Sequence, residues 1–209
     1  MRLPRPPLLI VTDRNQTRAP LQDLLAACFA AGCRWASVRE KDLTPAEQIA
    51  LAERLLPIAR RWHARLTLHG DPAVAQDAGL DGVHLAAGAN LHRARAMLGS
   101  DALIGISIHE VEDAAGLDGG AVDYAVAGPA YVTASKPGYG PAIGPGGVGE
   151  ICRATAVPII AIGGITAGAV QDMHVAGAVG VAVMGGVMRA HDPAREVKNL
   201  IAALRSGAS

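Results

Sequence analysis

The chain has 209 residues, and 19 lysines and arginines balance 19 aspartates and glutamates, so its formal net charge is zero. A nucleic-acid-binding surface or a polybasic membrane patch needs an excess of positive charge, and the composition therefore argues against both. Half of the residues are hydrophobic, but 41 are alanine, 25 are glycine and only 3% are aromatic. We therefore expect a folded chain whose core is built from small side chains, not a disordered one.

The chain contains three cysteines, Cys28, Cys33 and Cys152, and none of them belongs to a Cys-x-x-Cys pair. This spacing argues against a disulfide framework or a structural zinc site and indicates reduced thiols in a cytoplasmic protein. We also expect no membrane-spanning helix, because no apolar run reaches the roughly 20 residues that such a helix needs. The basic first residues lead into mixed apolar and polar positions, a pattern that does not predict a signal peptide.

Short apolar runs alternate with helical patterns along the whole chain. The runs predict eight strands, at residues 8–12, 36–39, 65–69, 82–85, 103–108, 124–127, 159–162 and 181–184. Apolar spacing and prolines in early turns predict eight helices, at residues 20–31, 45–62, 72–78, 92–98, from about 110, then 147–154, 167–176 and 193–204.

Such alternation predicts a parallel sheet with helical crossovers. Eight short and regular units favour a single-domain (β/α)8 TIM barrel over residues 1–209, with the barrel proper at about 8–206. The alternative is an open, doubly wound sheet. Polar and glycine residues gather where the predicted strands end, which is where barrel enzymes keep their active sites.

Glycine pairs follow the last two predicted strands: Gly163 and Gly164 after the seventh, Gly185 and Gly186 after the eighth. Glycine lets the backbone approach a ligand closely, and its N–H group can point at an anion. In barrels the loops after strands seven and eight commonly bind phosphate. One pair alone is explained by a tight turn, but two pairs in these two loops predict a phosphate site.

Two further segments carry candidate anion-binding side chains. Arg39 and Lys41 end the second predicted strand, and strand alternation places them on one side with Glu40 on the other. Two cations there suit a phosphate or diphosphate, although a solvated charged turn is the alternative. The long loop from Gly128 to Gly147 is either a lid or a mobile surface loop. As a lid, it would bring Lys136 over an anionic leaving group, with Thr133 and Ser135 as hydrogen-bond donors.

Asp71, at the end of the third predicted strand, is the candidate metal ligand, since a carboxylate beside a diphosphate can hold Mg²⁺. A second role is compatible with the first: Asp71 precedes Pro72 and can cap the helix that begins there. Among the histidines at strand ends we expect His84 to be structural, because the sequence contains no pair with metal-ligand spacing around it.

Six segments together resemble the thiamine-phosphate synthase and TenI family over nearly the whole chain. They are Ser37 to Asp42, Asp81 to Leu85, Gly105 to His109, Asp123 to Pro129, Thr133 to Lys136 and Pro158 to Ile165. The family fold is a (β/α)8 barrel. The resemblance implies that hydroxymethylpyrimidine diphosphate and thiazole phosphate are joined with release of diphosphate, with Mg²⁺, through a pyrimidine carbocation that the thiazole nitrogen traps. It also implies a homodimer.

Residue by residue, the resemblance assigns three parts of the site. Arg39, Lys41 and Lys136 match the positions that hold the diphosphate, with Ser107 beside them. Thr133 and Ser135 match hydroxyls near the thiazole, and Gly163, Gly164 and Gly185 match the thiazole phosphate site. Within this assignment Lys136, Ser107 and Arg39 are the predicted catalytic residues.

Three positions depart from the family pattern. Ser37 stands where the family has a glutamine that contacts the pyrimidine, and Gly70 replaces an asparagine next to Asp71. Asn90 lies in place of a second metal-binding carboxylate, which weakens the expected Mg²⁺ site because hard cations prefer charged oxygen ligands. Three functions therefore stay open: the synthase in a divergent form, a TenI-like thiazole tautomerase, and a barrel that binds another phosphorylated ligand. The tautomerase needs an acid or base near the thiazole, where this sequence has Gly128 and Pro129.

Overall fold

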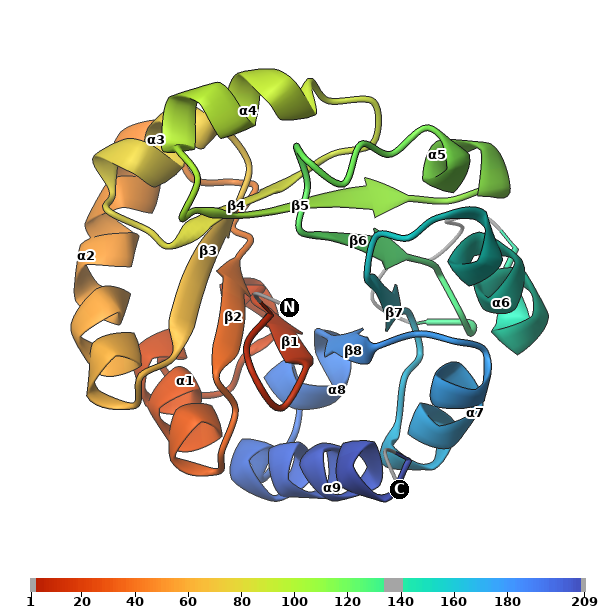
Figure 1. The fold of residues 1–209 in the computed structure, drawn as a ribbon. Helices are drawn as coiled ribbons and strands as arrows, with labels where there is room; N and C mark the ends of the chain where they lie inside the picture. Colours follow the sequence, from red (N-terminus) through yellow and green to blue (C-terminus); the bar gives the residue numbers. More distant parts are fainter. Residues whose placement is uncertain (1–2, 134–140, 208–209) are drawn as a thin grey trace.

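A computed structural model of the protein describes residues 3–133 and 141–207 and shows a closed barrel of eight parallel strands in chain order (Figure 1). The sheet closes because β1 pairs with both β2 and β8. The strands are β1 (Leu8–Val11), β2 (Trp35–Val38), β3 (Arg65–His69), β4 (Gly82–Leu85), β5 (Leu103–Ile108), β6 (Tyr124–Ala127), β7 (Ile159–Ile162) and β8 (Gly180–Val183). This closure confirms the predicted TIM barrel and excludes the open sheet.

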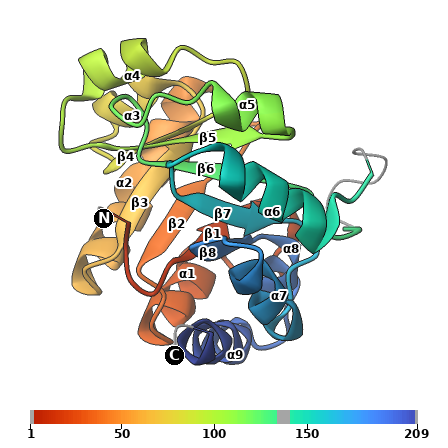
Figure 2. The same cartoon turned by 45° about the vertical axis from the view of Figure 1, so that its right-hand side comes forward.

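A layer of helices surrounds the strands (Figure 2). The α-helices are α1 (Leu21–Ala30), α2 (Pro45–Arg61), α3 (Pro72–Asp77), α4 (Leu91–Leu98), α5 (Val111–Ala115), α6 (Gly144–Ala154), α7 (Val170–Val175), α8 (Gly185–Met188) and α9 (Pro193–Ser206). Two short 3-10 helices, η1 (Arg14–Gln16) and η2 (Ala167–Ala169), lie in loops.

The predicted bounds differ from the structure in a few places. Strands β2 and β8 begin and end one residue before their predicted positions, and β1 ends at Val11 instead of residue 12. Helix α6 begins at Gly144, three residues before the predicted start. The prediction missed α8 entirely, because its first two residues are glycines and glycine has a low helix propensity. Tertiary packing decides this short helix: Val187 and Met188 at its end are buried.

Helix α2 illustrates how local sequence and packing agree. Thr44 accepts a hydrogen bond from the Glu47 N–H, and the Glu47 carboxylate accepts one from the Thr44 N–H, which is a complete capping box before Pro45. The helix then buries a stripe of leucine and alanine that includes Leu51 and Ala52. Buried alanines let helices lie close to the sheet, which accounts for the alanine-rich composition.

The barrel interior is filled by aromatic and aliphatic side chains. Trp35 and Tyr124 are fully buried and meet edge to face, with their ring centroids 4.6 Å apart. Gly105 has no side chain where the Tyr124 ring lies: a Cβ at Gly105 would be 2.0 Å from the Tyr124 Cζ. The two large rings therefore pack at the barrel axis among aliphatic side chains such as Leu9, Leu103 and Ile160, and the missing side chain of Gly105 makes room for Tyr124.

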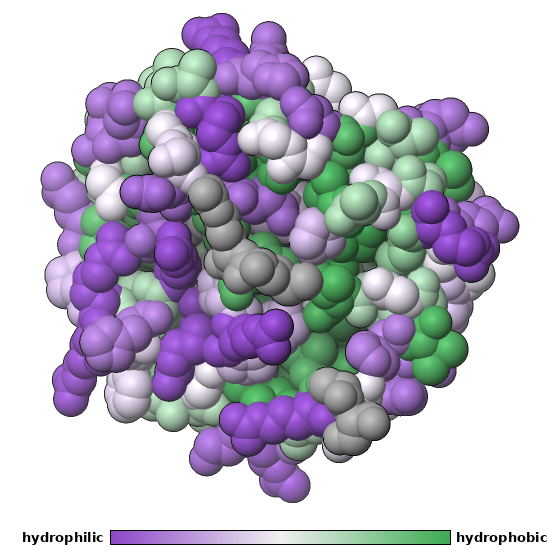
Figure 3. Space-filling model, in the orientation of Figure 1, coloured by the Kyte–Doolittle hydropathy of each residue, from purple (hydrophilic) through white to green (hydrophobic). Residues whose placement is uncertain are grey.

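Figure 1 looks down the barrel axis from the end at which the chain enters β1, and the N-terminus lies near the axis. On this face hydrophilic residues gather on the left, and hydrophobic residues show to the right of centre (Figure 3). The C-terminal ends of the strands lie on the opposite side. Among the described residues we find no helix that combines the length and the apolar character needed to cross a membrane.

Candidate active site

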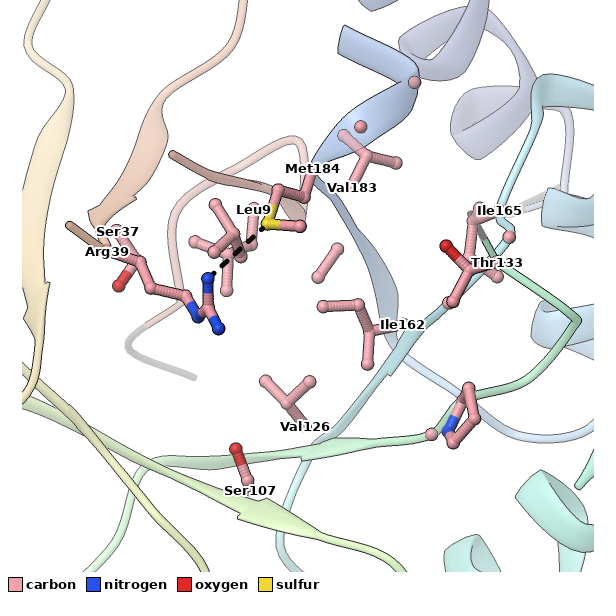
Figure 4. Close-up of a pocket in the computed structure, with 18 of the residues that line it drawn as sticks. Leu9, Ser37, Arg39, Ser107, Val126, Thr133, Ile162, Ile165, Val183 and Met184 are labelled. Atoms are coloured by element: carbon pink, nitrogen blue, oxygen red, sulfur yellow. Dashed lines mark hydrogen bonds between the residues drawn. The ribbon is translucent and has the colours of Figure 1, made fainter. Parts of the chain in front are cut away.

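A pocket of about 270 Å³ opens at the C-terminal ends of the strands, and residues from all eight strands or the loops after them line it. Its walls are largely apolar, with Leu9, Val126, Ile162 and Met184 facing the cavity (Figure 4). Polar groups interrupt these walls at a few separate points. Such a pocket suits a flat organic ring whose substituents meet individual polar groups at the edge.

The side chain of Arg39 points into the pocket (Figure 4). It follows β2 directly, and its backbone N–H donates to the Thr12 hydroxyl at 2.9 Å. Its guanidinium Nη1 lies 3.9 Å from the sulfur of Met184, which follows β8. A sulfur is a weak acceptor, so this contact leaves the guanidinium suited to a stronger, anionic partner.

The neighbouring Glu40 points away from the pocket, as strand alternation predicts, and is 3% exposed. Its carboxylate accepts hydrogen bonds from the Thr12 hydroxyl at 2.6 Å, the Arg14 N–H at 3.0 Å and the Arg14 guanidinium at 3.1 Å. Arg14 also pairs with both oxygens of Asp42, and this contact holds the pKa of Asp42 well below its usual range. This network ties the end of β1 to the loop that carries Arg39.

Lys41 is exposed and does not line the pocket, although the sequence predicts it beside Arg39. The expectation of a shared side assumed that the strand continues through residue 41. Strand β2 ends at Val38, and a turn follows in which the Leu43 N–H donates to the Glu40 carbonyl oxygen. The structure therefore does not bring the two cations together.

The first glycine pair makes a turn that only glycine can make without strain. Gly163 and Gly164 have φ angles of 101° and 64°. A Cβ on Gly163 would lie 2.7 Å from the Pro129 Cα, and one on Gly164 would lie 2.7 Å from the Val132 carbonyl oxygen. Backbone geometry alone thus accounts for this pair, and both residues also line the pocket.

The second glycine pair begins helix α8, and both of its residues line the pocket. The N–H groups of Val187 and Met188 donate to the Met184 carbonyl oxygen, so those of Gly185 and Gly186 precede the first bonds within the helix. A Cβ on Gly186 would meet no heavy atom within 4 Å. Crowding therefore does not explain the glycine at position 186, which leaves the backbone here open to the pocket.

Ser37, where the family resemblance expects glutamine, is fully buried and lines the pocket. Its hydroxyl has no hydrogen-bond partner among the described residues. An unpaired buried hydroxyl costs free energy, so a ligand atom that pairs with Ser37 would restore a lost hydrogen bond.

His84, which the sequence predicts to be structural, lies in the pocket wall, and the sequence does not reveal this position. Its Nε2 is 2.9 Å from the Ser107 hydroxyl and its Nδ1 is 3.2 Å from the Tyr124 hydroxyl. Burial, together with the neighbouring His69, lowers the pKa of His84 well below its usual value. The ring is therefore neutral at physiological pH.

The other predicted binding residues divide into two groups. Thr133 lines the pocket on the side opposite Arg39 (Figure 4). Ser135 and Lys136 lie outside the described residues, so their predicted roles stay predictions.

The two predicted metal positions act as helix caps. Asp71 accepts a hydrogen bond from the Ala73 N–H at 2.8 Å, and Asn90 accepts one from the Arg93 N–H at 2.9 Å. Neither lines the pocket. The part of the chain that the structure describes contains no group of three His, Cys, Asp or Glu side chains arranged to hold a metal ion.

A closed eight-stranded parallel barrel with a polar-edged pocket at the strand ends is the architecture of a TIM-barrel enzyme. The profile of a family described as thiamine monophosphate synthase matches residues 8–187. The chain belongs to this family, which confirms the resemblance read from its motifs.

Individual relatives agree with this assignment. The chain is 36% identical over 200 residues to the thiamine-phosphate synthase of Salinispora tropica, covering 94% of this chain and 96% of that one. It is also 37% identical over 184 residues to the thiamine biosynthesis bifunctional protein ThiM/ThiE of Symbiobacterium thermophilum. That match includes 88% of this chain and 38% of the longer protein. The solved thiamine phosphate pyrophosphorylase of Pyrococcus furiosus shares the fold, with a TM-score of 0.85 at 24% identity over 97% of this chain and 96% of that one.

Proposed function

We propose that this protein is a transferase that joins hydroxymethylpyrimidine diphosphate to thiazole phosphate and releases diphosphate. Family membership over most of the chain is the observation that carries the proposal. The pocket supports it, because an apolar cavity lies between Arg39 on one side and two glycine loops on another. This layout suits two ring substrates that each carry phosphate.

In this proposal the bond from the pyrimidine methylene carbon to the diphosphate oxygen breaks, and its electrons leave with the diphosphate. The thiazole nitrogen then forms the new bond to that carbon. Such chemistry depends on neutralising the leaving group more than on a strong base. Arg39 and Ser107 would bind diphosphate oxygens, while the amides of Gly185 and Gly186 would bind the thiazole phosphate.

Two features of this chain would adapt the site to the departures from the family pattern. The Ser37 hydroxyl, buried and unpaired among the described residues, would hydrogen-bond the pyrimidine in place of the usual glutamine. Asp71 would be the protein ligand of a Mg²⁺ ion bound with the diphosphate, and the ion would supply additional positive charge to the leaving group.

The test is formation of thiamine phosphate from the two purified substrates, followed together with diphosphate release, with Mg²⁺ and with EDTA. We expect equal amounts of both products with Mg²⁺, and a sharp fall in rate in Arg39→Gln. Arg54→Gln is the matched control, because Arg54 is exposed on α2 and does not line the pocket. Failure of the unaltered protein to form either product would overturn the proposal. Proton exchange on a thiazole carboxylate phosphate would instead indicate the tautomerase, and phosphate binding without either reaction would indicate a binding protein.

A further inference from the structure

A row of side chains crosses the barrel interior at one level and ends at the pocket. Strand register pairs His69 with His84, His84 with Gly105, and Gly105 with Tyr124. Since Gly105 has no side chain, the side chains of His84 and Tyr124 meet across it. Nδ1 of His84 lies 3.2 Å from the hydroxyl oxygen of Tyr124. Ser107 is two residues beyond Gly105 on β5, on the same face of the strand, and contacts the other nitrogen of His84.

We propose that Tyr124, which does not line the pocket, is a positioning residue that acts through His84 to direct the hydroxyl hydrogen of Ser107 toward an anionic oxygen of the bound substrate. This inference rests on the proposed function for the identity of the substrate. The inference requires one particular order of hydrogen bonds along the row.

Counting protons leaves two possible orders. Burial raises the pKa of the Tyr124 phenol, so the phenol keeps its hydrogen, and the neutral His84 ring carries one N–H. If the phenol donates to Nδ1 of His84, the ring hydrogen is on Nε2 and is donated to Ser107. The Ser107 oxygen then accepts from His84, and its own hydrogen is available to a ligand in the pocket.

The reverse order is the alternative, in which Ser107 donates to His84 and His84 donates to the phenol. The Thr67 hydroxyl donates to the Ala36 carbonyl oxygen at 3.3 Å and also contacts the phenol, so it can accept the phenol hydrogen in this order. The protein groups by themselves therefore allow both orders. An anionic oxygen in the pocket favours the first order, because only in that order is the Ser107 hydrogen available to it.

The position of these groups makes a purely packing role insufficient. His84 is 3% exposed and Tyr124 is fully buried, so apolar side chains at these positions would avoid the cost of burying three polar atoms. Instead, continuous hydrogen bonds join Tyr124, His84 and Ser107. Ser107, the last of the three, lines the pocket. In a low-dielectric interior the hydrogen bonds of such a set strengthen one another.

The experiment combines a kinetic cycle with a spectroscopic measurement. Tyr124→Phe keeps the buried ring and removes only the hydroxyl, and we expect kcat for thiamine phosphate formation to fall about tenfold, the worth of one hydrogen bond. Ser107→Ala should lower kcat at least as much. Adding Tyr124→Phe to Ser107→Ala should change kcat by less than roughly twofold, because the two residues act as one unit. Ile160→Val is the matched control: it removes a methylene from the same interior cluster outside the row and should leave kcat unchanged.

Nitrogen-15 NMR of the histidine rings, with His84 assigned by the signals lost in His84→Gln, reads the tautomer directly. We expect a protonated Nε2 and an unprotonated Nδ1 in the unaltered protein, and a mixture of both forms in Tyr124→Phe. A proton on Nδ1 in the unaltered protein overturns the inference, and so do fully additive effects in the kinetic cycle. If the unaltered protein forms no thiamine phosphate, the proposed function fails while the ring-nitrogen signals still decide the order of the row.

Discussion

Substitution of Gly186 by alanine should make the protein more stable and, at the same time, a weaker binder of its phosphorylated substrate. The added Cβ meets no heavy atom within 4 Å, and the φ angle of Gly186 lies outside the positive range that side chains avoid. Replacing glycine by alanine within a helix is worth about 0.5–1 kcal/mol. For a chain of this size that gain raises Tm by roughly 1–4 °C.

The loss of affinity comes from the ligand side of the same position. Gly186 lines the pocket, and a methyl group there keeps a phosphate from its closest approach to the first amides of α8. Losing one hydrogen bond to a charged group costs about 1.5–3 kcal/mol, which raises KM for thiazole phosphate by about 10- to 150-fold.

The assay measures Tm by thermal unfolding and KM for thiazole phosphate with the pyrimidine substrate saturating. Gly146→Ala is the matched control, because this exposed glycine of α6 also has no heavy atom within 4 Å of its added Cβ and does not line the pocket. It should raise Tm in the same way and leave KM unchanged. A normal KM in a stabilised Gly186→Ala protein would refute the reasoning that α8 binds the phosphate. An equal rise of KM in Gly186→Ala and Gly146→Ala would show that the effect on binding is not local.

Two other predictions concern groups outside the pocket. Glu40→Gln removes the charge from the buried carboxylate that Thr12 and Arg14 contact, while Arg14 keeps its pair with Asp42, and it should lower the free energy of unfolding by about 2 kcal/mol in urea titrations. The exposed Glu53→Gln should change it by less than about 0.5 kcal/mol. A loss below about 1 kcal/mol in Glu40→Gln would contradict the network. Burial raises the pKa of Cys33 to about 12 and that of Cys28 still higher, so at pH 8 a disulfide reagent should label neither thiol in the native protein and both in urea. Rapid native labelling of two or more thiols would be inconsistent with their burial.

The order of the strands and most of their bounds were predictable because they depend on local pattern. Alternating apolar runs and helical spacing predict the order of the elements, and five of the eight strands have the predicted bounds. The glycine loops and Arg39 were predictable as pocket residues for the same reason, since any residue that follows a parallel strand of a barrel lies at its C-terminal face. Asp71 as a helix cap also follows from the adjacent Pro72.

Other features depend on contacts between distant segments. The turn after β2 keeps Lys41 out of the pocket that Arg39 lines. Glu40 accepts hydrogen bonds from Arg14, which precedes it by 26 residues and lies on another loop. Tyr124 reaches His84 across 40 residues because strand register places Gly105 between them. The sequence by itself determined the barrel, the family and the face that carries the pocket, because these depend on periodicity and motifs within short segments. Only the tertiary structure decided which side chains meet, because register between strands and turns at their ends bring together residues that no local pattern connects.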